Sequence, residues 1–258
     1  MTGTGPVSPR AVLRPGARAL GTWLKLAVPE PVEIVAGAGF DFVVVDLEHA
    51  PIGIETAAWL LSSARAHGLV PFVRIPDHRP STVQLMLDAG ACGLFVPRVD
   101  SLAQAEAVAR AFSFPPEGTR GSGGTSRAGH WGRLPTPDYL GFGRDEAMLI
   151  VQLEAESGIV DAEWIAALPA VAGLFVGAAD LALSTGSTPS SDDVLAHIGT
   201  ARAAAHGAGK VFGLAYGAAP AAIRTAFDRG TDFVVGGNDA SLLASAAADL
   251  VTGVRESA

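Results

Sequence analysis

One apolar segment of the sequence, beginning at Phe42, ends in polar residues. If it is a strand, its side chains alternate between two faces. Phe42, Val44, Asp46 and Glu48 share one face, and His49 follows directly. If the segment is a strand of a barrel, this face points to the interior. Burying an unpaired carboxylate is costly, so Asp46 and Glu48 are expected at the open carboxyl end of the barrel, where active sites of that fold form.

Other apolar segments show the same change to polar side chains at their carboxyl ends. Arg74 ends one of them, Gln152 and Glu154 end another, and Asp180 follows a third. Taken alone, each of these residues has an ordinary explanation as a cap, a salt-bridge partner or a solvated side chain. Their coincidence with the first segment indicates that they converge on one rim of the fold.

These residue types suit metal-assisted chemistry on a bound carbonyl compound. Glu154 and Asp180 end neighbouring strands about 4.8 Å apart, so both carboxylates can reach one hard cation such as Mg²⁺ or Mn²⁺. Such a cation polarises a carbonyl group, and Arg74 can offset developing enolate charge. His49 can transfer a proton, and Asp46, three residues earlier, can fix the tautomer of its ring.

Lysine usage bears on the rival imine mechanism. Lys25 and Lys210 are the two lysines of the sequence. A Schiff-base aldolase needs a lysine at the open end of its barrel. Lys210 precedes an expected strand and falls at the closed end, whereas Lys25 ends the first strand and remains geometrically possible. An imine mechanism is therefore disfavoured but open.

Strand-like apolar segments alternate along the chain with Ala-rich amphipathic segments. The expected strands are 19–25, 41–47, 71–75, 93–98, 148–154, 172–177, 211–216 and 232–236. The expected helices are 31–38, 54–67, 80–89, 101–111, 157–167, 190–207, 218–229 and 240–254. Eight such units in about 240 residues predict a single (β/α)₈ TIM barrel over residues 19–258. An open doubly wound sheet is disfavoured because no glycine-rich fingerprint follows the first strand.

Two segments depart from this alternation. Residues 1–18 are rich in Gly, Pro and Arg and are interpreted as a flexible N-terminal arm. Residues 113–147 form a long connection, and such loops in compact domains are usually functional or disordered. The string at 120–126 is similar to a phosphate loop, but it lacks the Gly-Lys-Ser/Thr ending and follows a helix. An ordered surface or interface loop is therefore favoured.

The composition excludes several classes of protein. Of the 258 residues, 49% are hydrophobic and 17% are charged, which excludes a disordered chain. The net charge of −8 argues against nucleic acid as a partner. No apolar run is long enough for a membrane span, and the single cysteine, Cys92, fits a reducing compartment. We therefore expect a cytoplasmic protein that binds neither nucleic acid nor a membrane.

Short motifs occur in a fixed order between about residue 19 and residue 254. They are Gly21-Thr-Trp23, Ala38-Gly-Phe-Asp-Phe42, Asp46-Leu-Glu-His-Ala-Pro51, Val73-Arg-Ile-Pro76, Leu87-Asp-Ala-Gly90, Phe95-Val-Pro97, Gly118-Thr-Arg-Gly121, Gln152-Leu-Glu154 and Phe175-Val-Gly-Ala-Ala-Asp-Leu181. Together they resemble the metal-dependent class II pyruvate aldolases, the family of 4-hydroxy-2-oxoheptanedioate and 2-dehydro-3-deoxyglucarate aldolases. The block at 46–51 and the pair formed by Gln-x-Glu and Gly-x-x-Asp are the more specific motifs.

The resemblance implies reversible aldol cleavage of a 4-hydroxy-2-oxo acid to pyruvate and an aldehyde, with oxaloacetate decarboxylation as a side activity. It implies that Glu154 and Asp180 hold a divalent metal, Mg²⁺ or Mn²⁺, with Co²⁺ or Zn²⁺ as alternatives. Pyruvate or its enolate would chelate this metal through its carboxylate and keto oxygens. The implied substrate-binding residues are Trp23, Gln152, Gly177, Ala178 and Ala179, the last three through backbone amides.

The resemblance also implies roles in proton transfer and assembly. Arg74 would steady the keto or enolate oxygen, and His49, paired with Asp46, would manage the proton of the 4-hydroxyl group. Glu48 would support this arrangement, and Asp88 would contribute to the site of a neighbouring subunit. Members of the family commonly form hexamers, as trimers of dimers, that exchange the last helix between subunits, and the same assembly is expected here.

Two positions depart from the family pattern. Ala178 stands where proline is common, and Arg98 replaces a more usual Met or His. Both leave the expected metal site unchanged, but they bear on the acceptor aldehyde, and we hypothesise that Arg98 reads an anionic substituent. Two alternative functions stay open: an acyl-CoA ester lyase similar to the citrate lyase β-subunit, and a non-catalytic binder of 2-oxo acids.

Overall fold

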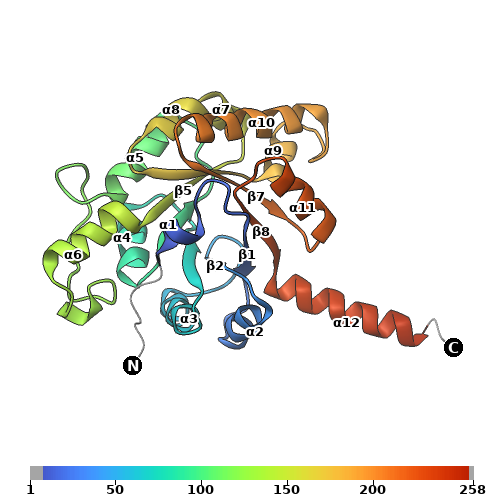
Figure 1. Cartoon of the computed structure of the whole chain (residues 1–258), viewed down its shortest axis with the longest axis horizontal. Coiled ribbons are helices and arrows are strands. Elements are labelled where there is room, and N and C mark those ends of the chain that lie inside the picture. The colour runs from blue at the N-terminus through green and yellow to red at the C-terminus, as the bar shows by residue number, and fades with distance from the viewer. Residues whose placement is uncertain (1–7, 256–258) are drawn as a thin grey trace.

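The computed structural model describes residues 8–255. Its parallel strands form a closed barrel in chain order, with β8 paired to β1 (Figure 1). The strands are β1 (Ala19–Leu24), β2 (Phe42–Asp46), β3 (Val70–Arg74), β4 (Gly93–Val96), β5 (Met148–Leu153), β6 (Val171–Val176), β7 (Val211–Tyr216) and β8 (Phe233–Asn238). Every expected strand is present within about two residues of its predicted bounds, and the predicted TIM barrel is confirmed.

Helices surround the barrel and follow most strands. They are α2 (Glu30–Ala38), α3 (Ile54–Ala66), α4 (Pro80–Asp88), α5 (Leu102–Phe112), α7 (Glu156–Val160), α8 (Ala162–Ala167), α9 (Ala178–Ser184), α10 (Asp192–Gly207) and α11 (Pro220–Asp228). The helix expected at 157–167 is divided at Asp161, whose carboxylate accepts a hydrogen bond from the backbone N–H of Leu102 at 2.7 Å. The short helix α9 was not expected; it begins directly after Gly177, at the carboxyl end of β6.

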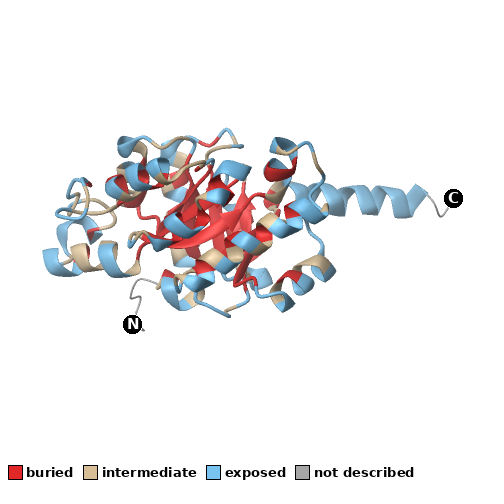
Figure 2. Ribbon diagram, turned by 90° about the horizontal axis from the view of Figure 1, so that it is seen from above, coloured by how far each residue is buried: buried red, intermediate tan, exposed pale blue. Residues whose placement is uncertain are grey.

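The core consists of two layers separated by the strands. Aromatic side chains fill the barrel interior, where Phe42, Phe72 and Phe95 meet in edge-to-face contacts at centroid distances of 5.5 to 5.8 Å. Val43 and Val45 instead pack outward against the helices. Figure 2 shows the buried strands as a continuous red centre under helices with exposed outer faces. The alternation predicted for the second strand is therefore confirmed, and with it the inward direction of Asp46.

The N-terminal segment packs against the barrel over the residues that the structure describes. Helix α1 (Pro9–Val12) is capped by the Ser8 side chain, which accepts from the backbone N–H of Ala11 at 3.2 Å. Leu13 is fully buried against the barrel interior. Residues 8–18, part of the arm that was expected to be flexible, are thus anchored to the barrel by an apolar side chain. Residues 1–7 lie outside the described residues.

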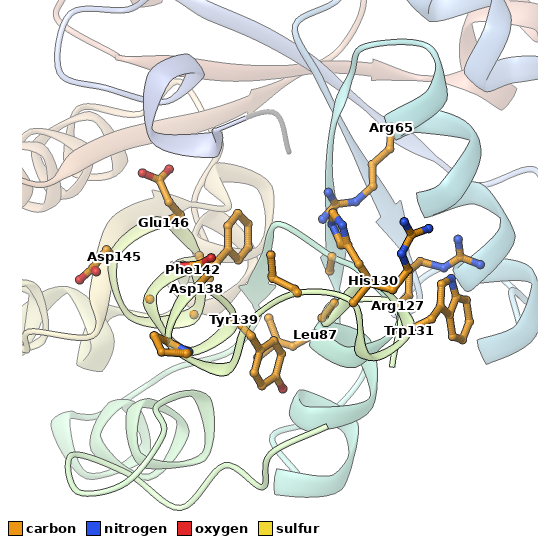
Figure 3. A pocket seen from close by; sticks show the side chains of 18 of the residues that line it. Arg65, Leu87, Arg127, His130, Trp131, Asp138, Tyr139, Phe142, Asp145 and Glu146 are labelled. Atoms are coloured by element: carbon orange, nitrogen blue, oxygen red, sulfur yellow. The ribbon is translucent and has the colours of Figure 1, made fainter. Parts of the chain in front are cut away.

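The long connection at 113–147 folds into short helical turns beside α3 and α4. These are η1 (His130–Gly132), α6 (Thr136–Gly141) and η2 (Phe142–Glu146). With the ends of α3 and α4 they enclose a cavity of about 1050 Å³, whose lining includes Arg65, Arg127 and Glu146 (Figure 3). Because the connection joins the end of α5 to the start of β5, this cavity lies at the amino ends of the strands. The polar strand ends that suggested chemistry lie at the opposite end.

The last helix, α12 (Asp239–Arg255), extends away from the barrel (Figure 1). Asp239 is its one buried residue, and Leu243, Leu250 and Val254 are each about two-thirds exposed. Its attachment is specific, since the Asp239 carboxylate accepts the backbone N–H groups of Lys25 and Leu26 at 2.9 and 3.0 Å. No helix within residues 8–255 is long and apolar enough to cross a membrane.

Candidate active site

Asp46 ends β2 fully buried, and Arg74, its register partner on β3, neutralises it. The guanidinium of Arg74 donates through Nε to Oδ1 at 2.9 Å and through Nη2 to Oδ2 at 2.7 Å. The Nζ atom of Lys25 lies 3.3 Å from Oδ2. Burial acts to raise the pKa of Asp46, but the hydrogen bonds and charge of Arg74 outweigh it and hold this pKa below its ordinary value.

Arg74 is held on three sides. Its guanidinium lies over the Trp23 ring with the Cζ atom 4.2 Å from the ring centroid, a distance typical of a cation–π contact. Its Nη1 atom lies 3.3 Å from Oε2 of Glu48. Trp23 is itself fixed from below by edge-to-face contacts with Phe95 and Phe175 of the barrel interior. The Arg74 guanidinium is thus held in a fixed position at the carboxyl end of the barrel.

Glu154 follows β5 in a buried position among other acids. Its Oε1 atom accepts Gln152 Nε2 at 3.0 Å, and its Oε2 atom accepts the backbone N–H of Arg98 at 3.0 Å. Burial, followed by the charges of Glu48 and Asp180, raises the pKa of Glu154 from 4.5 to about 7. The ends of β2 and β6 therefore bring the carboxyl groups of Glu48 and Asp180 close enough to Glu154 to disfavour its charge.

The donor set of this acidic cluster fits a hard divalent cation. Carboxylate and carbonyl oxygens are the ligands of Mg²⁺ and Mn²⁺, and a cation between Glu154 and Asp180 would relieve the repulsion that raises the pKa of Glu154. The Oε1 atom of Gln152 is also buried, with no hydrogen-bond partner among the residues that the structure describes. Within residues 8–255, no group of three or more His, Cys, Asp or Glu forms a complete ligand set. Water and substrate oxygens would have to complete the coordination shell.

His49 lies at the rim with about half of its side chain exposed. Its Nε2 atom is 3.6 Å from Oε2 of Glu48. The contact from His49 to Asp46 is its backbone N–H, at 3.1 Å, and not its ring. The rest of the Asp46 carboxylate is engaged by the backbone N–H of Glu48 and by the side chains of Arg74 and Lys25. The expected pairing of Asp46 with the His49 ring is therefore wrong, and Glu48 is the acid beside that ring.

The predicted backbone contacts lie at the start of α9. Gly177 donates its N–H to the carbonyl of Leu153 at 3.3 Å, so this amide is already engaged. Ala178 and Ala179 form the first turn of the helix, where N–H groups lack intrahelical acceptors. Gly177 favours close packing against Glu154, because a Cβ atom there would lie 3.0 Å from Cγ of Glu154 and the Glu154 side chain would have to shift.

Comparison with known proteins identifies the family and the fold. A family model described as HpcH/HpaI aldolase/citrate lyase matches residues 19–246. The chain belongs to this family. The match spans all eight strands and thus every residue of the acidic cluster and of the Asp46–Arg74 pair. Aldolases of the HpcH/HpaI family generally depend on a divalent metal, in agreement with the donor set.

Similar proteins cover the chain almost completely. A hydroxypyruvate/pyruvate aldolase from Chromohalobacter salexigens is 38% identical over 250 residues, 96% of this chain and 97% of the relative. A 4-hydroxy-2-oxo-heptane-1,7-dioate aldolase from Escherichia coli is 34% identical over 241 residues, 92% of this chain and 91% of the relative. The crystal structure of an HpcH/HpaI aldolase/citrate lyase family protein from Burkholderia cenocepacia superposes with a TM-score of 0.85 at 34% identity, covering 94% and 95% of the two chains.

Asp88 lies apart from the other predicted site residues. It ends α4, and helices of a TIM barrel end near the amino ends of the strands. Its Oδ1 atom accepts Arg120 Nη2 at 3.1 Å, and its carbonyl accepts the backbone N–H of Ala128. Within a single HpcH/HpaI subunit, Asp88 therefore supports the long connection and does not reach Glu154.

Two residues have contacts in the site that the sequence reasoning missed. Lys25 was considered only as an imine-forming residue, whereas its ammonium pairs with Asp46. Arg98 was considered only for its side chain, whereas its backbone N–H holds Glu154. The signal for Lys25 was available, since it directly follows β1 and can reach the rim. The backbone contact of Arg98 left no signal, because residue type does not specify a main-chain donor.

Proposed function

We propose that this chain is a metal-dependent carbon–carbon lyase that reversibly cleaves a 4-hydroxy-2-oxo acid to pyruvate and an aldehyde. The observation that carries the proposal is the acidic cluster of Glu48, Glu154 and Asp180 beside a cation, Arg74, fixed by Asp46 and Trp23. Relatives named as hydroxypyruvate/pyruvate and 4-hydroxy-2-oxo acid aldolases support the same chemistry. Oxaloacetate decarboxylation would be a side activity, since it also yields the enolate of pyruvate.

Glu154 and Asp180 would hold the divalent cation. When bound, Mg²⁺ or Mn²⁺, or alternatively Co²⁺ or Zn²⁺, supplies Lewis-acid polarisation of the donor carbonyl. Gln152 fixes one oxygen of Glu154 and the Arg98 N–H fixes the other, so the carboxylate is oriented before substrate arrives. Ala178 and Ala179 would receive the donor carboxylate through their backbone N–H groups.

Arg74 would stabilise negative charge on the keto oxygen of the donor. Its guanidinium is rigid, because Asp46 engages Nε and Nη2 and Trp23 covers one face. A fixed charge placed where charge develops lowers a barrier without reorganisation. His49 would take the proton of the 4-hydroxyl group during cleavage and return it during synthesis, with Glu48 beside its ring.

We further propose that the chain assembles as a hexamer, a trimer of dimers, in which α12 is exchanged. The exposed apolar residues of α12 support this, since a helix attached mainly at its first residue has its apolar side chains uncovered. Asp88, at the amino end of its own barrel, would serve the site of a second copy. A cytoplasmic location is proposed on the single buried cysteine, Cys92, which suits a reducing compartment.

The decisive experiment separates donor activation from carbon–carbon bond chemistry. Exchange of the methyl protons of pyruvate with deuterium, followed by NMR, reports enolate formation without any aldehyde. Exchange and aldol cleavage should both need added Mg²⁺ or Mn²⁺ after exhaustive chelation, and Glu154→Gln should abolish both. Full activity in the chelated protein would refute the proposal.

The same experiment separates the two alternatives. A silent 2-oxo acid binder would bind pyruvate, and His49→Ala would leave its function unchanged, but it would show no turnover. An acyl-CoA lyase would cleave a CoA ester, but the chain's net charge of −8 gives that polyanionic substrate no general attraction.

A further inference from the structure

Arg98 has an unusual backbone at the rim of the barrel. It follows Pro97 after β4, and its φ angle is +52°, a conformation that non-glycine residues rarely adopt. This turn directs its N–H to Oε2 of Glu154 at 3.0 Å. Such strained positions persist when surrounding structure requires them, and they gather at functional sites. The Arg98 side chain is therefore anchored by its own main chain next to the proposed metal ligand.

The guanidinium of Arg98 keeps most of its binding capacity. Nearly two-thirds of the side chain is exposed, and its recorded ion pair within residues 8–255 joins Nε to Oε1 of Glu48 at 3.5 Å. That distance is too long for a strong hydrogen bond, and the described structure records none from this guanidinium. Arg74 differs, because Asp46 and Glu48 already engage its three nitrogens and its side chain is only 7% exposed.

The charge balance of the site depends on the Arg98 side chain. Asp46, Glu48, Glu154 and Asp180 face three cationic side chains, those of Lys25, Arg74 and Arg98. With a divalent cation and the donor carboxylate added, these charges sum to zero. Without Arg98 the same site would carry one net negative charge and would repel a second anion.

We propose that Arg98 binds the oxyanion group, carboxylate or phosphate, of an anionic acceptor aldehyde. The inference rests on the proposed aldolase function and adds the substrate class. The planar guanidinium presents several N–H donors that match a carboxylate or phosphate, and Arg98 offers them at the exposed edge of the site. The aldehyde carbon would then lie between this rim and the donor beside Arg74.

The test compares aldehydes that differ in charge, in the direction of aldol synthesis with pyruvate. Succinic semialdehyde carries a carboxylate, glyceraldehyde 3-phosphate carries a phosphate, and propanal is neutral. Arg98→Met should lower the ratio of kcat/KM for an anionic aldehyde to kcat/KM for propanal about tenfold, mainly through KM. Arg98→Lys should lower it less, since it keeps the charge but not the planar donors. The anionic aldehyde whose kcat/KM ratio falls more in Arg98→Met carries the preferred oxyanion.

Arg79 provides a matched control. It precedes α4 at the same end of the barrel, its side chain is 79% exposed, and its charge is paired with Asp77. Arg79→Met should leave the ratio unchanged. A ratio unaffected by Arg98→Met, or lowered equally by Arg79→Met, would overturn the inference.

Deuterium exchange into pyruvate keeps this failure distinct from failure of the proposed function. If the wild-type protein exchanges the pyruvate protons and Arg98→Met leaves the ratio unchanged, only the role of Arg98 is refuted. If the wild-type protein neither exchanges protons nor forms an aldol product, the proposed function fails and the inference fails with it. Rising salt should also weaken the preference for the anionic aldehyde in the wild-type protein more than in Arg98→Met.

Discussion

Replacing Glu154 with glutamine should stabilise the metal-free protein at alkaline pH while it removes activity. Folded Glu154 keeps its proton up to about pH 7, whereas an ordinary glutamate releases it near 4.5. Between these values the folded state binds more protons than the unfolded state, so the free energy of unfolding falls as the pH rises. Each tenfold change in proton affinity corresponds to about 1.4 kcal/mol, so above pH 7 the wild type has lost about 3 kcal/mol of its free energy of unfolding.

The assay is urea unfolding of metal-free protein at pH 5 and pH 8. Glutamine carries no charge, so Glu154→Gln should exceed the wild type in free energy of unfolding by about 2–3 kcal/mol at pH 8 and by little at pH 5. Glu163→Gln is the control, because Glu163 is an exposed glutamate of α8, away from the site. It should change neither value appreciably.

Added Mn²⁺ provides the second arm of this experiment. A ligand that binds only the folded state stabilises it by about 2.7 kcal/mol at one hundred times its dissociation constant. The wild type should gain stability at pH 8, and Glu154→Gln should gain little. If Glu154→Gln is no more stable than the wild type in metal-free buffer at pH 8, the charge of Glu154 does not destabilise the metal-free fold. The reasoning that a bound cation relieves this destabilisation is then refuted.

The other predictions concern the cation pair, the proton and the assembly. Asp46→Asn should lower the free energy of unfolding in urea by about 3–5 kcal/mol, because it removes the negative charge that pairs with Arg74 in a buried site. A decrease below about 1 kcal/mol would contradict this. His49→Ala should lower kcat for aldol cleavage by about 10²–10⁴, with KM for the 4-hydroxy-2-oxo acid little changed, and an unaltered kcat would exclude His49 as the proton carrier. Leu250→Asp should shift the assembly to smaller species in light scattering. Mixing Asp88→Ala with Glu154→Gln subunits should restore part of the activity, because a Glu154→Gln subunit can supply Asp88 to the intact Glu154 site of its neighbour. If Asp88 serves only its own chain, the mixture should stay inactive.

The fold followed from the sequence because its signals are local and repeated. Each strand is an apolar run with a fixed alternation, so the inward direction of Phe42, Val44 and Asp46 could be derived without knowing any neighbour. Polar residues at successive strand ends then had to share a rim. Helix α9 was missed because its seven residues follow Gly177 without a strong start signal. Leu13 was missed because a single apolar anchor does not form a pattern.

The partners within the site could not be derived in the same way. Nearness in sequence suggested that Asp46 orients the ring of His49, yet Asp46 pairs with Arg74, which is 28 residues away but directly adjacent across the β2–β3 register. A strand end directs its last inward side chain toward the neighbouring strand, while the residues after it turn toward the rim. Pairing in a parallel barrel is therefore decided by register, which the sequence of one strand does not contain.

The polar groups of the site fall into two sets, which differ in how completely other protein groups pair with them. Asp46, Arg74 and Trp23 form a closed arrangement in which charge, hydrogen bonds and a ring face are all matched. Asp180 repels the charge of Glu154, and within residues 8–255 most N–H donors of Arg98 have no recorded partner. A buried group that is matched costs little in the resting protein, whereas an unmatched one stores free energy that a ligand can recover. The unmatched groups thus mark where the metal, the donor and the acceptor should bind, and the matched pair marks the charge that must stay fixed while they react.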